Sequence, residues 1–232
     1  MTQLHLPISL EPNATFNNFY CANNHTETMV HQLMDTEKSI ILCGKSGSGK
    51  THLLHAICHQ TPMRWLYLDC NNHKLTSPDI LDNMEEKCVC LDNIHALARV
   101  KKWEDGLFKL MLHHHRLVLS TQPHIAMQRH ELQSRILAMN TFDLHELSEQ
   151  DQHRALLQRS QRKGLPISDT VITWMQRHLP RNNQFLFHFI DQMEAESLRR
   201  QQKATIHLAR IVWDSMASPE KTTTAIQEQS EH

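Results

Sequence analysis

The sequence feature that most restricts the fold of this chain is GKSGSGKT, residues 44–51, which matches the pattern GxxxxGK[ST] at every fixed position. An apolar run, KSIILC, precedes it, and a segment with leucines at helical spacing follows it. This order of strand, glycine loop and helix lets backbone N–H groups surround a phosphate, while Lys50 reaches the β and γ phosphates and the Thr51 hydroxyl binds Mg²⁺. We therefore predict a nucleotide and magnesium site. Its residues are Gly44, Lys45, Ser46, Gly47, Ser48, Gly49, Lys50 and Thr51.

Four more short apolar segments alternate with helical or irregular stretches along the first two thirds of the chain. Together with the run before the glycine loop they predict a five-stranded parallel sheet flanked by helices, an α/β fold, because parallel strands need helical crossovers and are buried on both faces. The segments are RWLYLD (64–69), CVCLDN (88–93), RLVLST (116–121) and TFDL (141–144), and the first run is 38–43.

After Leu147 the strand pattern stops and helices with recognisable caps follow. Ser148 with Asp151 resembles a capping box, Gly164 is suited to end that helix, and Ser168 is suited to cap the next. Two further helices are predicted over 182–201 and 206–216, and residues 29–34 are predicted to be helical near the start of the chain. The expected divisions are a peptide at 1–10, an α/β domain at 11–146, an all-α domain at 147–217 and a polar, disordered tail at 218–232.

Composition excludes several classes of function. The 24 Lys+Arg and 25 Asp+Glu residues leave a formal net charge of -1, so no overall positive field favours nucleic acid. No apolar run approaches the ~20 residues that span a bilayer, and no signal pattern opens the chain. Six cysteines occur without CxxC spacing, which indicates buried free thiols in the cytoplasm.

A second feature of P-loop proteins is an acid at the end of another buried strand, and Asp92 of CVCLDN has that position. Such an aspartate alone is as often a turn former, but with the P-loop upstream we predict that it holds Mg²⁺ through water. Asn93 stands where many ATPases carry an acid that activates water. An amide cannot accept that proton, so slow self-hydrolysis is expected.

Two other sets of side chains leave alternatives open. Ser120 and Thr121 end the strand RLVLST, where a hydroxyl either senses the γ-phosphate or caps the next turn. His55 and His59 share a helix face, and residues 113–115 are a histidine run, but neither has Cys or carboxylate partners at metal-ligand spacing. We expect these histidines to lie on solvated helix faces.

The P-loop, the strand-end aspartate, the hydroxyl-tipped strand and the trailing helical domain resemble AAA+ ATPases of the bacterial DnaA branch. Within that branch the chain is most similar to the DnaA regulatory inactivator (Hda) family. The resemblance covers nearly the whole chain, through QLHLP, TFNNFY, SGSGKTHLLHA, LDNI, SRIL and FIDQME. It implies an adaptor that binds ADP or ATP with Mg²⁺ and prevents re-initiation of chromosomal replication by promoting hydrolysis of DnaA-bound ATP, with weak or no ATPase activity of its own.

The opening residues, TQLHLP, suit either a first strand or a peptide that docks in another protein's pocket. The resemblance implies docking on the β subunit of the DNA polymerase sliding clamp. Two leucines would anchor in an apolar pocket, a glutamine would bond at its rim, and a proline would limit the entropy lost on ordering. The residues are Gln3, Leu4, Leu6 and Pro7.

The resemblance also assigns two arginines. Arg135, in the SRIL segment, matches the family's arginine finger, which acts on the nucleotide of a neighbouring subunit. In the helical domain the family carries a second arginine that senses the nucleotide of its own subunit, and Gln184 occupies that place here. Either Arg181, one turn earlier, substitutes for it, or sensing by the lid is weakened.

The implied partners are the sliding clamp and DnaA, with homodimers or higher oligomers left open and no membrane contact. Only a polar tail follows Met216, so DNA is expected to be reached only through the clamp. Two other functions stay open: a DnaC-like loader of the replicative helicase, which would not need QLHLP, and a P-loop nucleotide kinase, which would need an acceptor site and an arginine-rich lid.

Overall fold

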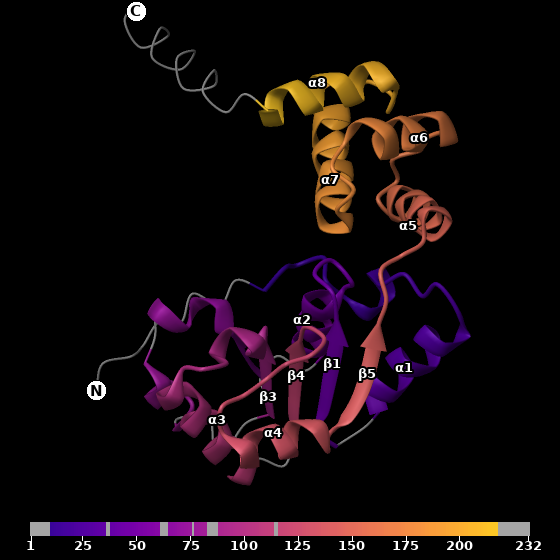
Figure 1. Cartoon of the computed structure of the whole chain (residues 1–232). Coiled ribbons are helices and arrows are strands. Elements are labelled where there is room, and N and C mark those ends of the chain that lie inside the picture. The colour runs from indigo at the N-terminus through magenta and orange to yellow at the C-terminus, as the bar shows by residue number, and fades with distance from the viewer. Residues whose placement is uncertain are drawn as a thin grey trace, which may run out of the picture. The chain divides into compact units, whose positions relative to one another are not determined.

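A computed structural model describes residues 10–35, 38–60, 65–75, 77–82, 88–113 and 116–217. The chain divides into two compact units, Met1–Glu146 and Leu147–His232, and each is described by itself (Figure 1). The four predicted docking residues, Gln3, Leu4, Leu6 and Pro7, and the predicted tail at 218–232 lie outside the described residues.

The first unit is built on a five-stranded, all-parallel sheet with the order β2-β3-β4-β1-β5. This confirms the predicted α/β class. In the central strand β1, Leu42 faces one side of the sheet with α2, whereas Ile41 faces the other with α3. The strands are β1 (Ile40–Gly44), β2 (Trp65–Asp69), β3 (Cys88–Asp92), β4 (Leu117–Thr121) and β5 (Asn140–Leu144).

Helices cover both faces of this sheet because both faces are apolar. Met29, Val30 and Leu33 of α1 pack on the same face as α2, and Leu107 of α3 with Leu132 of α4 packs on the other. The helices are α1 (Asn24–Asp35), α2 (Lys50–Gln60), α3 (Lys101–His113) and α4 (His130–Leu137); short 3-10 turns are η1 (Phe16–Asn18), η2 (Cys70–Leu75), η3 (Pro78–Ile80) and η5 (Ile94–Leu97).

The largest boundary difference from the sequence prediction is in α1, which was expected only over 29–34. It begins at Asn24 because Asn23 caps it: the Asn23 Oδ1 atom accepts the backbone N–H of Thr26 at 2.9 Å. The polar stretch before the apolar residues is therefore the first turn of the helix.

The second unit is a bundle of four helices with its own apolar core, centred on Phe189, Ile172 and Leu208. Ser148 caps the first helix as predicted, with its Oγ atom accepting the N–H of Asp151 at 3.1 Å. Ser168 has the N-cap position of the second helix but makes no cap bond, because its hydroxyl pairs with that of Thr170. The helices are α5 (Glu149–Arg162), α6 (Asp169–His178), α7 (Asn183–Arg200) and α8 (Ile206–Ala217).

Two expectations from composition are answered by this fold. All six cysteines are free, but only Cys58, Cys70 and Cys90 are buried; the other three are half-buried, so the prediction of six buried thiols is wrong for Cys21, Cys43 and Cys88. Within the described ranges, none of the helices combines the length and apolar character that crossing a membrane requires.

Candidate functional site

The P-loop lies where β1 ends and α2 begins, and it is curled around its own lysine. Gly47 and Gly49 have φ values of +81° and +96°, a backbone region that suits glycine and turns the loop tightly. Lys50 is 5% exposed as a residue, and its ammonium donates to the carbonyl oxygens of Gly44 and Lys45, both at 2.6 Å. The loop thus has the curled form that presents backbone N–H groups to a phosphate.

Burial is the main influence on this lysine and lowers its pKa, while the nearby Asp92 carboxylate opposes that shift. An ammonium held in this way is a point charge at the mouth of the loop. A bound phosphate would supply the anion that offsets its desolvation.

Asp92 ends β3 and is 1% exposed, with three hydroxyl groups directed at its carboxylate. The Thr51 hydroxyl donates to its Oδ2 atom at 2.6 Å and the Tyr67 hydroxyl donates to the same atom at 3.0 Å. The Ser120 hydroxyl donates to Oδ1. The structure therefore brings together Lys50, Thr51 and Asp92 although 41 residues separate the last two.

These donors fit a magnesium ion carried by a nucleotide. Mg²⁺ prefers oxygen ligands and keeps several waters, and the Thr51 hydroxyl and the Asp92 carboxylate are oxygen groups in direct contact at the edge of the P-loop. Because the Thr51 hydroxyl donates a hydrogen bond to Asp92, its oxygen lone pairs stay available for the metal. With a nucleotide bound, Thr51 and Asp92 would hold Mg²⁺, which would neutralise phosphate charge.

Sequence reasoning missed Tyr67, which lies in the middle of β2 next to β3. Burial, followed by the charge of Asp92, raises the pKa of its phenol far above the ordinary value, so the hydroxyl keeps its proton and remains a donor. The only signal in the sequence was a polar tip within an otherwise apolar strand.

Asn93, the residue expected to replace a water-activating acid, has a left-handed backbone with φ of 59°. Its side-chain amide donates to Asp69 Oδ1 at 3.0 Å, and its backbone N–H donates to Ser120 Oγ at 2.8 Å. One hydrogen of the Asn93 side-chain amide is thus bonded to the Asp69 carboxylate at the end of β2.

The two hydroxyls at the end of β4 have different surroundings. Ser120 links the Asp92 carboxylate to the Asn93 amide, as described above. The Thr121 hydroxyl, 2% exposed, instead donates to the carbonyl of Gln122 at 3.1 Å. Of the two hydroxyls predicted either to sense the γ-phosphate or to cap the turn, Ser120 contacts the Asp92 carboxylate and Thr121 does not; the sensing role of Thr121 stays a prediction.

His95 in η5 is a further group near the site that the sequence did not single out. Its Nδ1 atom is buried and has no hydrogen-bond partner within the described part of the chain. Burial lowers the pKa of this imidazole, and the positive charge of Lys50 lowers it further. The side chain is therefore a neutral ring beside the P-loop near pH 7.

Histidines on α2 hold the segment that leads from the N-terminus. His55 Nδ1 accepts the backbone N–H of Glu11 at 3.1 Å, and His59 Nε2 donates to the carbonyl of the same residue at 2.9 Å. His52 Nε2 donates to the carbonyl of Thr15 at 2.9 Å. The expectation of solvated histidines is wrong for His55, which is 7% exposed, because residues 10–19 cover this helix.

This segment also reaches the P-loop. The Phe19 ring lies so close to Gly49 that a Cβ atom there would be 2.7 Å from the ring, and the same ring contacts that of His52 with centroids 5.6 Å apart. Gly49 is therefore required both by its backbone angle and by the aromatic ring above it.

Arg135 lies away from this cluster, in the last turn of α4. Its side chain is exposed, with the guanidinium carbon 5.5 Å from the centroid of the Phe108 ring. Helix α4 leads into β5, whose first residue Asn140 pairs with Ile40 at the start of β1. Arg135 thus belongs to the amino-terminal edge of the sheet and the P-loop to the carboxyl-terminal edge (Figure 1).

Arg181 belongs to the second unit, where it is exposed just before Asn182, the N-cap of α7. Gln184 is exposed in the first turn of that helix. The sensing role of Arg181 stays a prediction.

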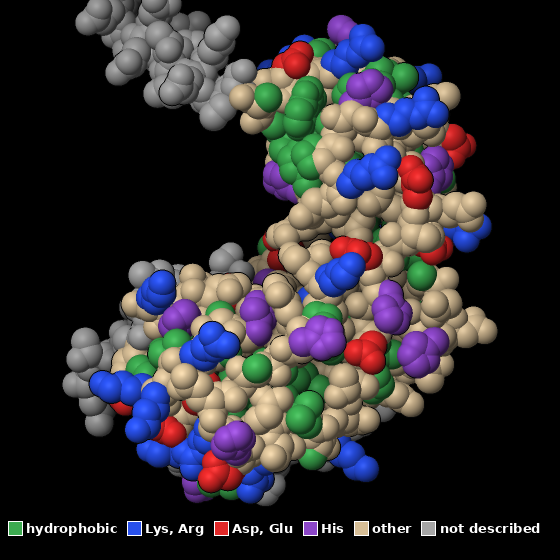
Figure 2. All heavy atoms as spheres, viewed as in Figure 1, with side chains coloured by type: hydrophobic (Ala, Val, Ile, Leu, Met, Phe, Trp, Pro, Cys, Tyr) green, Lys and Arg blue, Asp and Glu red, His purple; other side chains and the backbone are tan. Residues whose placement is uncertain are grey.

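Among the described residues, no group of three or more His, Cys, Asp or Glu side chains is placed to hold a metal ion. Figure 2 shows histidine side chains at separate places on the visible surface of both units.

The first comparison with known proteins concerns the helical unit. Residues 149–212 match the family model described as the Hda lid domain. The whole chain is similar to domain III of the replication initiation protein DnaA from Thermotoga maritima, with a TM-score of 0.71, 15% identity, and coverage of 89% of this chain and 98% of that one. The helical unit therefore matches an Hda lid domain, and the chain as a whole shares the fold of DnaA domain III.

Two further structures extend this likeness. AMPPCP-bound DnaA from Aquifex aeolicus gives a TM-score of 0.64 at 18% identity, covering 82% of this chain and 68% of that one. The Holliday junction branch migration motor RuvB from Thermotoga maritima gives 0.62 at 11% identity, covering 88% and 72%. At these identities the structures show the shared AAA+ fold alone.

Proposed function

We propose that this AAA+ protein regulates the initiation of DNA replication by stimulating hydrolysis of ATP bound to DnaA. It binds ADP or ATP with Mg²⁺ in its own P-loop, docks on the sliding clamp through its N-terminal peptide, and supplies Arg135 to the nucleotide of DnaA. The relatives support the first of these steps: one DnaA neighbour is described as bound to AMPPCP, an ATP analogue.

The observation that carries the proposal is the make-up of the nucleotide site. Lys50, Thr51 and Asp92 supply the phosphate and metal contacts, but the next position is an amide bonded to Asp69. Since Asn93 cannot act as a base, the site favours binding over turnover. A protein of this kind uses its nucleotide as a structural switch.

Arg135 supports the second half of the proposal. An arginine finger must reach the nucleotide of another subunit, and Arg135 is exposed at the opposite sheet edge from its own P-loop. In DnaA, water attacks the γ-phosphorus, the bond to the β–γ bridging oxygen breaks, and ADP and phosphate leave. The guanidinium donates hydrogen bonds to the oxygens on which charge develops.

The decisive experiment measures hydrolysis of ATP bound to DnaA, with the clamp loaded on DNA, in the presence of the wild-type chain or Arg135→Ala. We expect stimulation by the wild type and a loss of at least ~10³-fold in the stimulated rate for the variant. Arg135→Lys should restore little, because an ammonium lacks the planar fork. Arg210→Ala, an exposed arginine of α8, is the control.

Two results would overturn the proposal. One is the absence of stimulation by the wild-type chain, and the other is stimulation by Arg135→Ala equal to that of the wild type. The nucleotide affinity of the chain itself should be unchanged in Arg135→Ala, because that residue is remote from the P-loop within the first unit.

A further inference from the structure

Glu104, in the first turn of α3, is a buried acid that accepts hydrogen bonds from three backbone amides. It is 1% exposed. Its Oε1 atom accepts the N–H of Arg99 at 2.7 Å and that of Gln128 at 3.0 Å, and its Oε2 atom accepts the N–H of Arg129 at 2.8 Å. A buried carboxylate needs such compensation, and charge-assisted bonds of this kind are stronger than neutral ones.

Two of these amides belong to the start of α4, the helix that carries Arg135. Arg129 is the N-cap residue of α4 but provides no side-chain cap bond. Glu104 therefore accepts the amides of the N-cap residue and of the residue before it, where the chain enters the helix, in contrast to a local cap, whose side chain accepts the amide of the second or third helical residue. The helix is thus attached to α3 at its first turn.

The segment before α4 is also held in register with the helix. Gln133 accepts the N–H of Met127 at 2.7 Å through Oε1 and donates to the carbonyl of Ile125 at 3.1 Å through Nε2. Residues 125–129 therefore move with α4, so a bond from Glu104 to this segment constrains the whole helix.

The side chains of α3 continue this attachment to Arg135. Arg129 donates to Asp105 at 2.7 Å and its guanidinium carbon lies 3.8 Å from the centroid of the Phe108 ring. The guanidinium of Arg135 lies over the same ring at 5.5 Å. Phe108 follows Glu104 by one helical turn, so the acid and the ring act on α4 from one face of α3.

The third amide, that of Arg99, links Glu104 to the segment that follows β3 and the predicted nucleotide site. Arg99 has a left-handed backbone, with φ of 67°, and lies two residues after η5, the 3-10 turn that follows Asp92 and Asn93. The Glu104 carboxylate therefore holds both the segment that follows β3 and the segment that leads into α4.

We propose that Glu104 is a positioning residue for Arg135, an inference that rests on the proposed function. By binding the amides of Gln128 and Arg129, it sets the position of α4 and so the direction in which Arg135 leaves the domain. The guanidinium must meet the phosphoryl group of another protein, and a displacement of about 1 Å is enough to cost ~10²-fold in rate.

Glu104→Gln tests this with little change of shape. It replaces one carboxylate oxygen with an NH₂ group, which faces a backbone N–H and cannot accept it. With the clamp loaded on DNA, we expect the maximal stimulated rate of DnaA ATP hydrolysis to fall at least ~10-fold. The half-saturating concentration of the chain and its own nucleotide affinity should stay within about threefold, because neither depends on where the guanidinium points. Hydrogen exchange at the Gln128 and Arg129 amides should be faster.

A second pair of variants separates positioning from general loss of stability. Phe108→Leu removes the ring under Arg135 without leaving a buried polar group, and it should lower the maximal rate in the same way. Leu110→Ala, in the apolar core on the same helix, creates a cavity but leaves the Glu104 contacts in place. It should lower the melting temperature while the maximal rate at a temperature where the protein is folded stays near that of the wild type.

Arg135→Ala serves as the reference. If it stimulates like the wild type, the proposed function itself is wrong. If it abolishes stimulation while folded Glu104→Gln keeps the full maximal rate, only the positioning role is wrong. A loss of rate in Leu110→Ala equal to that in Glu104→Gln at matched stability would also overturn the positioning role.

Discussion

The hydroxyls around Asp92 show how single side chains orient the carboxylate of the predicted metal site. Three hydroxyls donate hydrogen bonds to this carboxylate, and they come from α2, β2 and β4: Thr51, Tyr67 and Ser120. This arrangement satisfies a buried acid and fixes its orientation. The carboxylate is therefore held at one place beside the P-loop instead of rotating among several.

Asp92→Asn should remove the effect of Mg²⁺ on nucleotide affinity. The amide loses the charge that attracts the metal and its waters, so ADP affinity with Mg²⁺ should fall roughly 10–100-fold, as expected for one charged contact. Titration of a fluorescent ADP analogue with and without Mg²⁺ measures this. Tyr67→Phe, which keeps the carboxylate, should retain the Mg²⁺ effect; an unchanged effect in Asp92→Asn would remove Asp92 from the metal site.

His55 predicts a pH dependence of stability. Burial lowers its pKa, His59 lowers it further, and the acids Asp92, Glu11 and Asp69 oppose the shift. The unfolded chain takes up a proton near pH 6.5, whereas the folded chain does so only at lower pH. The stability contributed by this neutral ring is therefore fully present above about pH 6.5 and is lost as pH falls toward the folded pKa.

Denaturant unfolding between about pH 5 and 8 checks this expectation. In His55→Asn an oxygen can still accept the Glu11 amide but nothing titrates, so the loss of unfolding free energy on acidification should be smaller. His113→Asn, at an exposed position of α3, is the matched control and should follow the wild type. Equal slopes for all three proteins would contradict the assignment.

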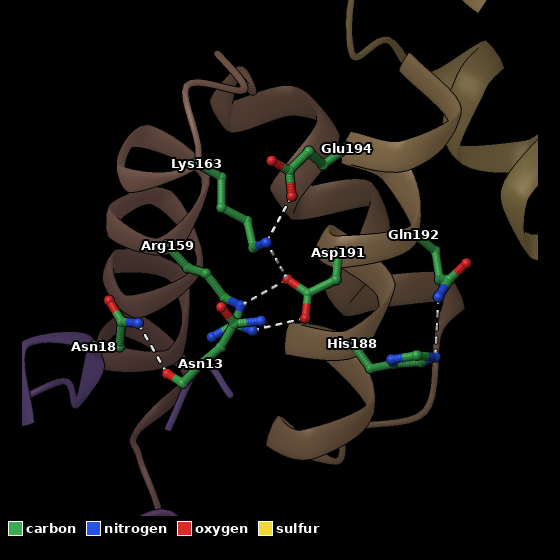
Figure 3. Close-up of polar contacts among 8 residues, drawn as sticks. All are labelled: Asn13, Asn18, Arg159, Lys163, His188, Asp191, Gln192 and Glu194. Atoms are coloured by element: carbon green, nitrogen blue, oxygen red, sulfur yellow. Dashed lines mark hydrogen bonds and ion pairs between the residues drawn. The ribbon is translucent and has the colours of Figure 1, made fainter. Parts of the chain in front are cut away.

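Between elements, polar contacts add to the apolar core in joining neighbouring helices. In the lid, Asp191 of α7 accepts a two-point contact from Arg159 of α5, at 3.2 and 2.7 Å. Lys163 of α5 contacts Asp191 at 3.1 Å and Glu194 at 2.6 Å. Figure 3 shows the four side chains meeting between the two helices.

Asp191→Ala should destabilise the lid, because it leaves two mostly buried cations with one acid. The side chains of Arg159 and Asp191 are 16% and 21% exposed, so the loss of unfolding free energy should be about 1–3 kcal/mol, below the value for a fully buried pair. Glu146→Ala, which removes an exposed contact to Lys45 at 3.6 Å, should cost under ~0.5 kcal/mol. Urea unfolding of both variants compares them, and equal losses would contradict the distinction.

For the complete protein, the N-terminal peptide is the expected link to the clamp. Two histidines of α2 bind the backbone of Glu11, the first residue after the predicted peptide at 1–10. Its residues lie outside the described ranges, and docking on the clamp stays a prediction.

The double variant Leu4→Ala, Leu6→Ala should lose clamp binding, because two apolar anchors are removed, while nucleotide affinity should not change. Surface plasmon resonance with immobilised clamp measures this. His5→Ala, between the two leucines, is the matched control and should bind like the wild type. Failure of the wild type to bind would return the peptide to its other interpretation and favour a helicase loader.

Local sequence was sufficient for the parts of this protein in which cause and effect lie close together along the chain. The P-loop is formed by contiguous residues. The apolar runs, Gly164 and the Ser148 cap each determine the structure of residues only a few positions away in the sequence. For this reason the α/β sheet, the helical lid and the positions of Lys50 in the P-loop and Asp92 at a strand end were predictable. The family resemblance added Arg135, which its own neighbours in sequence do not mark.

Only the tertiary structure revealed the contacts that join distant segments. Tyr67 reaches Asp92 across 25 residues, Glu104 reaches Gln128 across 24, and His55 reaches Glu11 across 44. Periodicity and spacing carry no record of which strand lies beside which, so a buried polar group and its distant partner look unrelated in the sequence. Packing brings them together because each must find a hydrogen-bond partner once water is excluded.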